Sequence, residues 1–209
     1  MSVPTFVEGL TEGLRDRGYT PQARSGSVFA FSRPVDEGVT AWLHLSINRA
    51  GNILTTVGVR FDAVQEIYAP AADEANNPQR TTLFQPLSGL LWPAEGYQSW
   101  RLGQGDDEAV RQRLLRDIDR ACEPWIARRQ SLHAVLEGLD ENESDVWSAG
   151  YLRPIVLHLL GRDAEAVAAL DARVAAIARE PDYPVARTFR AFARQYRAEL
   201  ASPSEETPA

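Results

Sequence analysis

The stretch LHLSINRAGNILTTVGVRF, residues 43 to 61, decides the fold, because its alternating apolar residues predict two β-strands joined by a turn. Successive side chains point to opposite faces of a strand, so the length of the loop determines which faces meet. A three-residue loop from Arg49 to Gly51, with Gly51 in the left-handed conformation, places Leu43 opposite Val57. The aliphatic rows that this register joins are Val39, Ala41, Leu43, Leu45, Ile47 and Ile53, Thr55, Val57, Val59, Phe61.

The same register brings polar and aromatic side chains together on the opposite face of the hairpin. The predicted pairs there are Trp42 with Gly58, His44 with Thr56, and Thr40 with Arg60. An indole over a strand glycine replaces packing that glycine cannot supply. Trp42, His44 and Arg60, with Arg80 further along the chain, are the candidate binding residues for an anionic ligand or a protein partner. The alternative is that the C-terminal helices cover this face and that Trp42 belongs to the core.

The flanking sequence predicts an α+β fold. Thr5 can cap an N-terminal helix that ends at Gly18, and VFAFSR at 28–33 reads as a further strand. A connector ending in a strand near 97–102 leads to a helix that begins at Asp106 and is ended or kinked at Pro124. We therefore expect an N-terminal helix and an antiparallel sheet of about four strands in a domain over residues 1–140.

The last third of the chain predicts helices. VWSAGYLRPIVLHLLG, RDAEAVAALDARVAAIARE and YPVARTFRAFARQYRAEL are three amphipathic segments, separated by Gly161 and Pro181. HLLGRDAEAVAALDARVA resembles part of a tetratricopeptide unit, but one unit cannot bury both of its faces, so packing on the sheet domain or on the long helix is expected. Residues 141–201 are expected to form a helical extension and residues 202–209 a disordered tail.

The composition limits the partners. The chain has 209 residues, a formal net charge of −7, and 22 basic residues that are all arginine. A field of this sign repels phosphate backbones and anionic membrane surfaces, so neither nucleic acid nor membrane is an expected partner. The first residues do not resemble a secretory signal, and no apolar run approaches the roughly 18 residues of a membrane helix, so a cytoplasmic location is expected.

The sequence contains no signature of catalysis. A phosphate-binding glycine loop, a zinc HExxH motif, a nucleophile elbow and paired cysteines are all missing from it. The segment DENESD at 140–145 has Asp145 where a calcium loop needs glycine, so it is interpreted as a capped helix start. His44, His133 and His158 are too scattered to predict a metal triad, and Cys122 is expected to be packed. No metal, no other cofactor and no catalytic residue is predicted.

An acidic segment offers a second place where a partner could bind. Asp73 to Arg80, together with Asp62 and Glu66, could present carboxylates to a basic protein. A solvated surface is the alternative interpretation of these residues.

A helix ending in RGY is followed along the chain by FAFSR, WLHLSIN, TTVGVRF, RTTLFQPLSGLL, YQSW and PWI. This order resembles an uncharacterised family of bacterial domains of unknown function, some of which occur near toxin and immunity genes. The resemblance covers about residues 5–140. It implies an α+β fold without an established activity. The leading hypothesis is a non-enzymatic, immunity-type protein that binds a basic protein partner. The alternative is a small-ligand-binding protein or enzyme with a pocket near His44 and Arg60.

Overall fold

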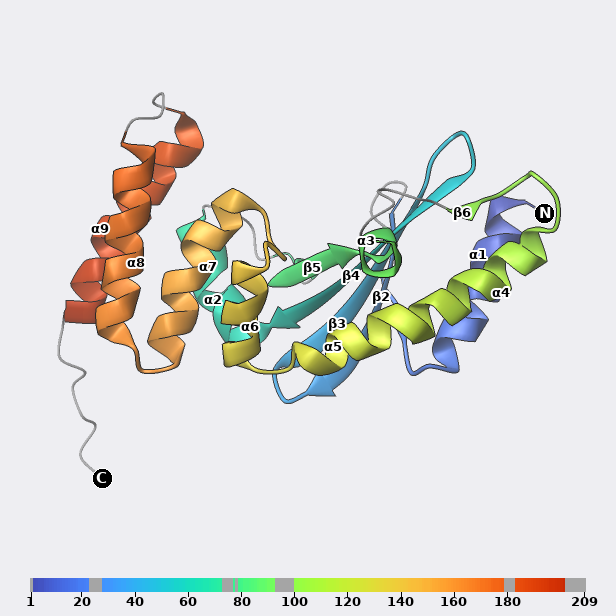
Figure 1. The fold of residues 1–209 in the computed structure, drawn as a ribbon, viewed down its shortest axis with the longest axis horizontal. Helices are drawn as coiled ribbons and strands as arrows, with labels where there is room; N and C mark the ends of the chain where they lie inside the picture. The colour runs from blue at the N-terminus through green and yellow to red at the C-terminus, as the bar shows by residue number, and fades with distance from the viewer. Residues whose placement is uncertain are drawn as a thin grey trace. The chain divides into compact units, whose positions relative to one another are not determined.

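The computed structural model of the chain describes residues 2–22, 28–72, 77, 79–92, 100–178 and 183–201. It divides into two compact units: a sheet unit, residues 1–61 and 79–130, and a helical unit, residues 62–78 and 131–209 (Figure 1). This division differs from the expected boundary near residue 140. Residues 62–78 belong to the helical unit although they interrupt the sheet unit in sequence, and the 132–140 helix packs with the helix that follows it.

The sheet unit contains an antiparallel sheet, which confirms the predicted α+β class. Within the described residues the sheet has six strands, of which four follow one another in the order β1-β2-β3-β4, with β5 and β6 both paired to β4. The strands are β1 (Thr20–Pro21), β2 (Val28–Asp36), β3 (Val39–Ile47), β4 (Asn52–Phe61), β5 (Leu83–Pro86) and β6 (Trp100–Arg101). Of the strand predicted at 97–102, residues 97–99 lie outside the described part of the chain.

The register of the central hairpin is confirmed. Leu43 pairs with Val57, and both side chains are fully buried. Gly51 has a φ of 81°, and its N–H donates to the carbonyl of Asn48 at 2.9 Å, which closes the predicted three-residue loop. The aliphatic rows of the two strands therefore lie on one face of the sheet.

Helices cover this aliphatic face. Arg33 pairs with Ala41 across the sheet, so the two side chains share a face, and the Arg33 guanidinium donates to Glu123 in the helical layer. The helices of the sheet unit are α1 (Val3–Arg15), α3 (Leu87–Leu91), α4 (Asp107–Asp117), the π-helix η1 (Ile118–Cys122) and α5 (Glu123–Arg128). The predicted capping by Thr5 is wrong: the Ser2 side chain caps α1 by accepting the Thr5 N–H, so the helix begins three residues earlier.

Pro124 does not end the helix that precedes it. The helix passes through η1, where the Glu123 N–H donates to the carbonyl of Ile118, five residues back, and continues to Arg128. A proline removes one backbone donor and crowds the preceding turn. The wider π turn lies directly before the proline, so helical backbone persists on both sides of it. Cys122, in this turn, is fully buried, as predicted.

The helical unit is built around α7, which contacts α2, α6, α8 and α9. Its helices are α2 (Asp62–Ala71), α6 (Leu132–Asp140), α7 (Val146–Leu159), α8 (Asp163–Ile177) and α9 (Pro184–Ala201). The three predicted C-terminal helices are thus confirmed (Figure 1). The ring of Tyr151 on α7 lies 5.6 Å from Tyr68 and 4.9 Å from both Phe189 and Phe192, which joins α2 and α9 to α7.

The segment DENESD leads into α7 as a capped helix start. Asp145 is the N-cap, and its carboxylate accepts the N–H groups of Trp147 and Ser148. This confirms the interpretation of the segment that the sequence favours. The predicted disordered tail, residues 202–209, lies outside the described residues.

Candidate functional site

The four predicted binding residues all lie in the sheet unit. Trp42 and His44 both belong to β3, and their rings stack on each other with centroids 5.7 Å apart and planes inclined by 10°. Arg60 lies on β4, opposite Thr40 of β3. Its Nη1 donates to the backbone carbonyl of Arg80 at 3.3 Å. The structure thus brings Trp42 to His44, and Arg60 to the backbone of Arg80.

Two of these four residues are buried, and His44 and Arg80 are partly exposed. Trp42 is 5% exposed and Arg60 is 8% exposed. Burial lowers the pKa of His44, and a hydrogen bond with the backbone of Gln79 opposes this shift in part. The indole Nε1 of Trp42 is buried without a hydrogen-bond partner in the described part of the chain. The burial fits the alternative interpretation that Trp42 belongs to the core, and it leaves His44 as the more accessible member of the stack.

The packing over Gly58 differs from the expected one. Gly58 does pair with Trp42, but the nearest side chain to a Cβ at this position is Thr81, whose methyl carbon would lie 2.4 Å away. The segment after Arg80 therefore packs on the strand glycine, and the indole stacks on His44. This contact could not be predicted from the hairpin alone, because Thr81 lies outside it.

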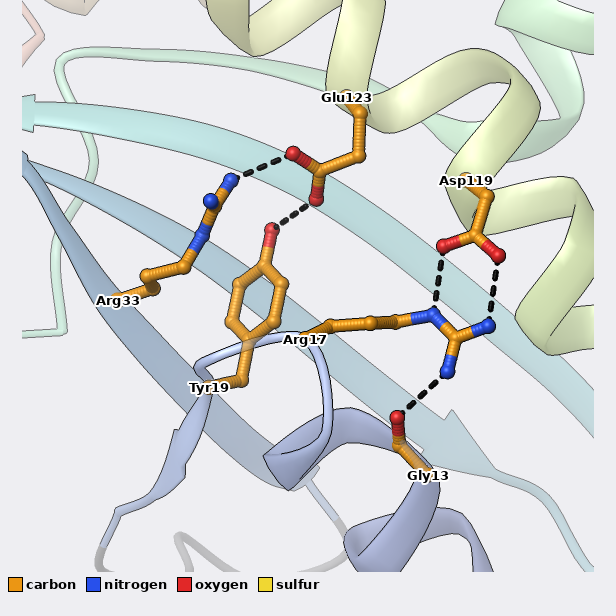
Figure 2. A network of polar contacts seen from close by, with 6 residues as sticks. All are labelled: Gly13, Arg17, Tyr19, Arg33, Asp119 and Glu123. Atoms are coloured by element: carbon orange, nitrogen blue, oxygen red, sulfur yellow. Dashed lines mark hydrogen bonds and ion pairs between the residues drawn. The ribbon is translucent and has the colours of Figure 1, made fainter.

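A polar network joins the helical layer to the sheet in the same unit (Figure 2). The Tyr19 hydroxyl donates to one oxygen of Glu123 at 3.1 Å, and Arg33 Nη2 donates to the other at 2.5 Å. The Arg33 guanidinium also lies 5.1 Å from the centre of the Tyr19 ring. Burial, followed by the charge of Glu123, raises the pKa of Tyr19. The phenol therefore stays protonated and acts as a donor to the carboxylate.

Arg17 makes a second connection in this network. Its Nε and Nη2 donate to the two carboxylate oxygens of Asp119 at 2.5 and 2.6 Å, while Nη1 donates to the carbonyl of Gly13 at 2.6 Å. The bidentate geometry fixes the end of α1 against η1. Each charge in these two connections is met by a group of the chain itself, so we assign the network a structural role.

A groove in the helical unit has a chemistry suited to a cation. It lies between α2 and α9, has a volume of about 690 Å³ and contains two exposed carboxylates, Glu66 from α2 and Glu199 from α9. The rings of Phe192 and Tyr196 line it and stack with centroids 5.1 Å apart. Carboxylates beside aromatic faces attract guanidinium and ammonium groups.

The hydroxyl of Tyr196 is a further feature of this groove. The residue is 4% exposed, and its hydroxyl oxygen is buried without a hydrogen-bond partner in the described residues. Burial, followed by the charges of Glu199 and Asp163, raises its pKa. Glu66 is the one residue of the groove that the sequence singles out. Residues 73–76 and 78 of the predicted acidic segment lie outside the described part of the chain.

Charge is divided unequally between the two units. The sheet unit has 14 arginines and 12 acidic residues, whereas the helical unit has 8 arginines and 17 acidic residues. Their formal charges are therefore +2 and −9, so the acidity of the chain resides in the helical unit. The groove between α2 and α9 lies in the unit whose field attracts cations.

Among the described residues, no group of three or more His, Cys, Asp or Glu side chains is arranged to hold a metal ion. In the same part of the chain, no helix combines the length and the apolar character needed to cross a bilayer.

Comparison with known proteins identifies no relative. No family model, no curated protein and no solved structure matches the chain significantly.

Proposed function

We propose that this chain is a non-enzymatic binding protein that captures a basic protein partner, as an immunity-type inhibitor captures a toxin. The observation that carries the proposal is the groove between α2 and α9, where Glu66 and Glu199 lie beside the rings of Phe192 and Tyr196. The formal charge of −9 on the helical unit supports it. A field of this sign increases the rate at which a basic partner encounters the unit.

The groove would hold an arginine or lysine side chain of the partner. Its cationic head would pair with Glu66 and Glu199, and its aliphatic stem would pack on the ring of Phe192. A guanidinium or ammonium that reaches Tyr196 would also donate to the unpaired hydroxyl oxygen. Leaving that oxygen buried and unpaired costs about 1–3 kcal/mol, which a bound donor would recover in part.

The test is direct association with basic proteins encoded beside this gene, measured by isothermal titration calorimetry with the full chain. We expect a dissociation constant below about 1 μM for one of them, and a loss of affinity of about tenfold or more in the double variant Glu66→Gln, Glu199→Gln. Glu8→Gln, Glu12→Gln is the matched control, because it removes the same charge from exposed positions on α1 in the sheet unit. The proposal fails if no neighbouring product associates, or if the two double variants lose affinity equally.

One observation favours the alternative of a small-ligand-binding protein or enzyme at His44 and Arg60. The buried indole Nε1 of Trp42 has no partner in the described residues, and a ligand oxygen beside the Trp42–His44 stack would satisfy it. Thermal shift screening of anionic metabolites would test this function. A ligand-induced shift that is lost in His44→Ala would support the alternative, and a shift that persists in His44→Ala would argue against it.

A further inference from the structure

The groove between α2 and α9 keeps two negative charges that the described part of the chain does not neutralise. Glu66 and Glu199 line it, and both side chains are exposed. Neither carboxylate has an ion-pair partner among the described residues. The contact described for Glu199 is a hydrogen bond from Gln195 Nε2 at 2.9 Å, which uses one of its two oxygens. Most of the hydrogen-bonding capacity of both carboxylates is therefore available to a ligand.

The uncharged polar side chains of the groove use protons within the chain. The Thr188 hydroxyl donates its single proton to the carbonyl of Pro184 at 3.2 Å, and the Gln195 amide donates one N–H to Glu199. Both residues line the groove, and their side-chain oxygens can still accept hydrogen bonds. The polar lining thus has more acceptors than donors to offer, which favours a ligand group that only donates.

The hydroxyl of Tyr196 adds a buried group in need of a partner. Tyr196 lines the groove and is 4% exposed, and its oxygen has no hydrogen-bond partner in the described residues. The charge of Glu199 contributes to the raised pKa of this phenol, so the hydroxyl lies within the field of a groove carboxylate. Buried polar groups in proteins are nearly always paired. An unpaired hydroxyl at the wall of a groove is a group that a bound donor can satisfy.

We propose that the groove selects arginine over lysine in the partner. This rests on the proposed function, because it names the residue by which a basic partner would be recognised. Arginine has five N–H donors in a planar fork and no acceptor, whereas lysine carries three donors on one nitrogen. The groove carboxylates come from two helices, Glu66 from α2 and Glu199 from α9. A guanidinium can donate to one carboxylate with each of two edges, whereas an ammonium presents its donors at a single point.

The apolar part of the groove suits the same side chain. Its apolar residues come from both helices and are Ile67, Pro70 and Ala71 of α2 with Ala191 and Phe192 of α9. The methylenes of an arginine side chain would pack on them while its head reaches the carboxylates. A guanidinium is also more weakly hydrated than an ammonium, so it loses less solvation when it enters an apolar groove.

The test compares a short labelled peptide of arginine and alanine with a copy that has lysine in place of each arginine. Fluorescence anisotropy with the full chain gives both dissociation constants. We expect the arginine peptide to bind at least about fivefold more tightly. In the double variant Glu66→Gln, Glu199→Gln this preference should fall to within about twofold. The control Glu8→Gln, Glu12→Gln removes the same charge from exposed positions on α1 and should retain the preference. Circular dichroism would verify that both variants are folded.

Three outcomes would overturn arginine selection by the groove. Equal affinities of the two peptides for the wild-type chain would mean that the groove responds to charge alone, and capture of a basic protein would then remain intact. The absence of saturable binding of the arginine peptide would also overturn it, as would an undiminished preference in Glu66→Gln, Glu199→Gln. Conversely, a preference that depends on the groove, together with no association of any neighbouring gene product, would refute the proposed function alone.

Discussion

His44 links the stability of the sheet unit to pH. Burial lowers its pKa in the folded chain, so the unfolded chain accepts a proton more readily. The stability that the neutral imidazole contributes is fully present above the unfolded pKa of about 6.5 and is lost as the pH falls through the folded pKa. We expect the free energy of unfolding, measured with urea, to fall between pH 7.5 and pH 5 by more in the wild type than in His44→Gln. Parallel pH profiles of the two proteins would contradict the burial of this imidazole.

Two turn glycines, Gly38 and Gly51, allow the energetic cost of a positive φ to be distinguished from the cost of a close contact. Gly51 and Gly38 both have positive φ values, 81° and 66°, but a Cβ at Gly51 would lie 2.8 Å from the carbonyl oxygen of Leu102, whereas nothing lies within 4 Å at Gly38. Alanine costs about 1–2 kcal/mol at either position through its left-handed conformation alone. We expect Gly51→Ala to lower the free energy of unfolding by clearly more than Gly38→Ala, as measured by chemical denaturation. Equal losses would mean that the Leu102 carbonyl yields without cost.

For single residues, the sequence predicts contacts that local strand geometry determines, and it does not predict contacts between residues far apart in the chain. The pairing of Leu43 with Val57 follows from strand periodicity and loop length, which nearby residues determine. Arg33 and Arg17 instead find Glu123 and Asp119, which lie 90 and 102 residues away, and no local pattern signals such pairs. The same holds for the cluster around Trp42: the stack with His44 follows from alternation, whereas the cover of Gly58 by Thr81 comes from a separate segment.

Helix ends are predicted only in part by the sequence. The N-cap position of Asp145 is read from acidic and polar residues before an apolar run, because the cap is a contact within three residues. The π-helix before Pro124 is different, since a widened turn is one of several ways to accommodate a proline and the packing of the finished helix selects among them. The N-cap of α1 is Ser2 instead of Thr5, although the two hydroxyls lie close together, so either residue type fits the cap and the sequence alone does not choose between them.

The cap of α7 can be tested by substitution. Asp145 accepts two backbone N–H groups, and the hydroxyl of Ser148 also donates to it. We expect Asp145→Ala to lower the free energy of unfolding of the chain by about 1–2 kcal/mol, measured by chemical denaturation, because free N–H groups at the start of α7 would lose their acceptor. Asp145→Asn is the control and should retain most of the stability, since an asparagine oxygen can still cap. A similar loss in both variants would assign the effect to charge instead of capping.

For the whole molecule, sequence order is a poor guide to the units. The net charge of −7 is the sum of +2 on the sheet unit and −9 on the helical unit. Residues 62–78 interrupt the sheet unit in sequence but belong with the helices that begin at Leu132. A division at residue 140 follows the change from strands to helices along the chain, but it assigns α2 to the wrong neighbours.

The division into units predicts the behaviour of a fragment that ends at residue 140. Such a fragment keeps α2 but lacks α7, so Tyr68, which is 3% exposed in the whole chain, loses its ring contact with Tyr151 and its hydrogen bond with Ser148. We expect the 1–140 fragment to bind the dye anilinonaphthalene sulfonate strongly and to associate in size-exclusion chromatography, because the apolar side of α2 would face water. Residues 1–201 are the matched control, since that truncation retains every described helix, and it should show neither property. A monomeric 1–140 fragment that does not bind the dye would mean that α2 needs no partner from the helical unit, and the boundary expected from the sequence would then be the better one.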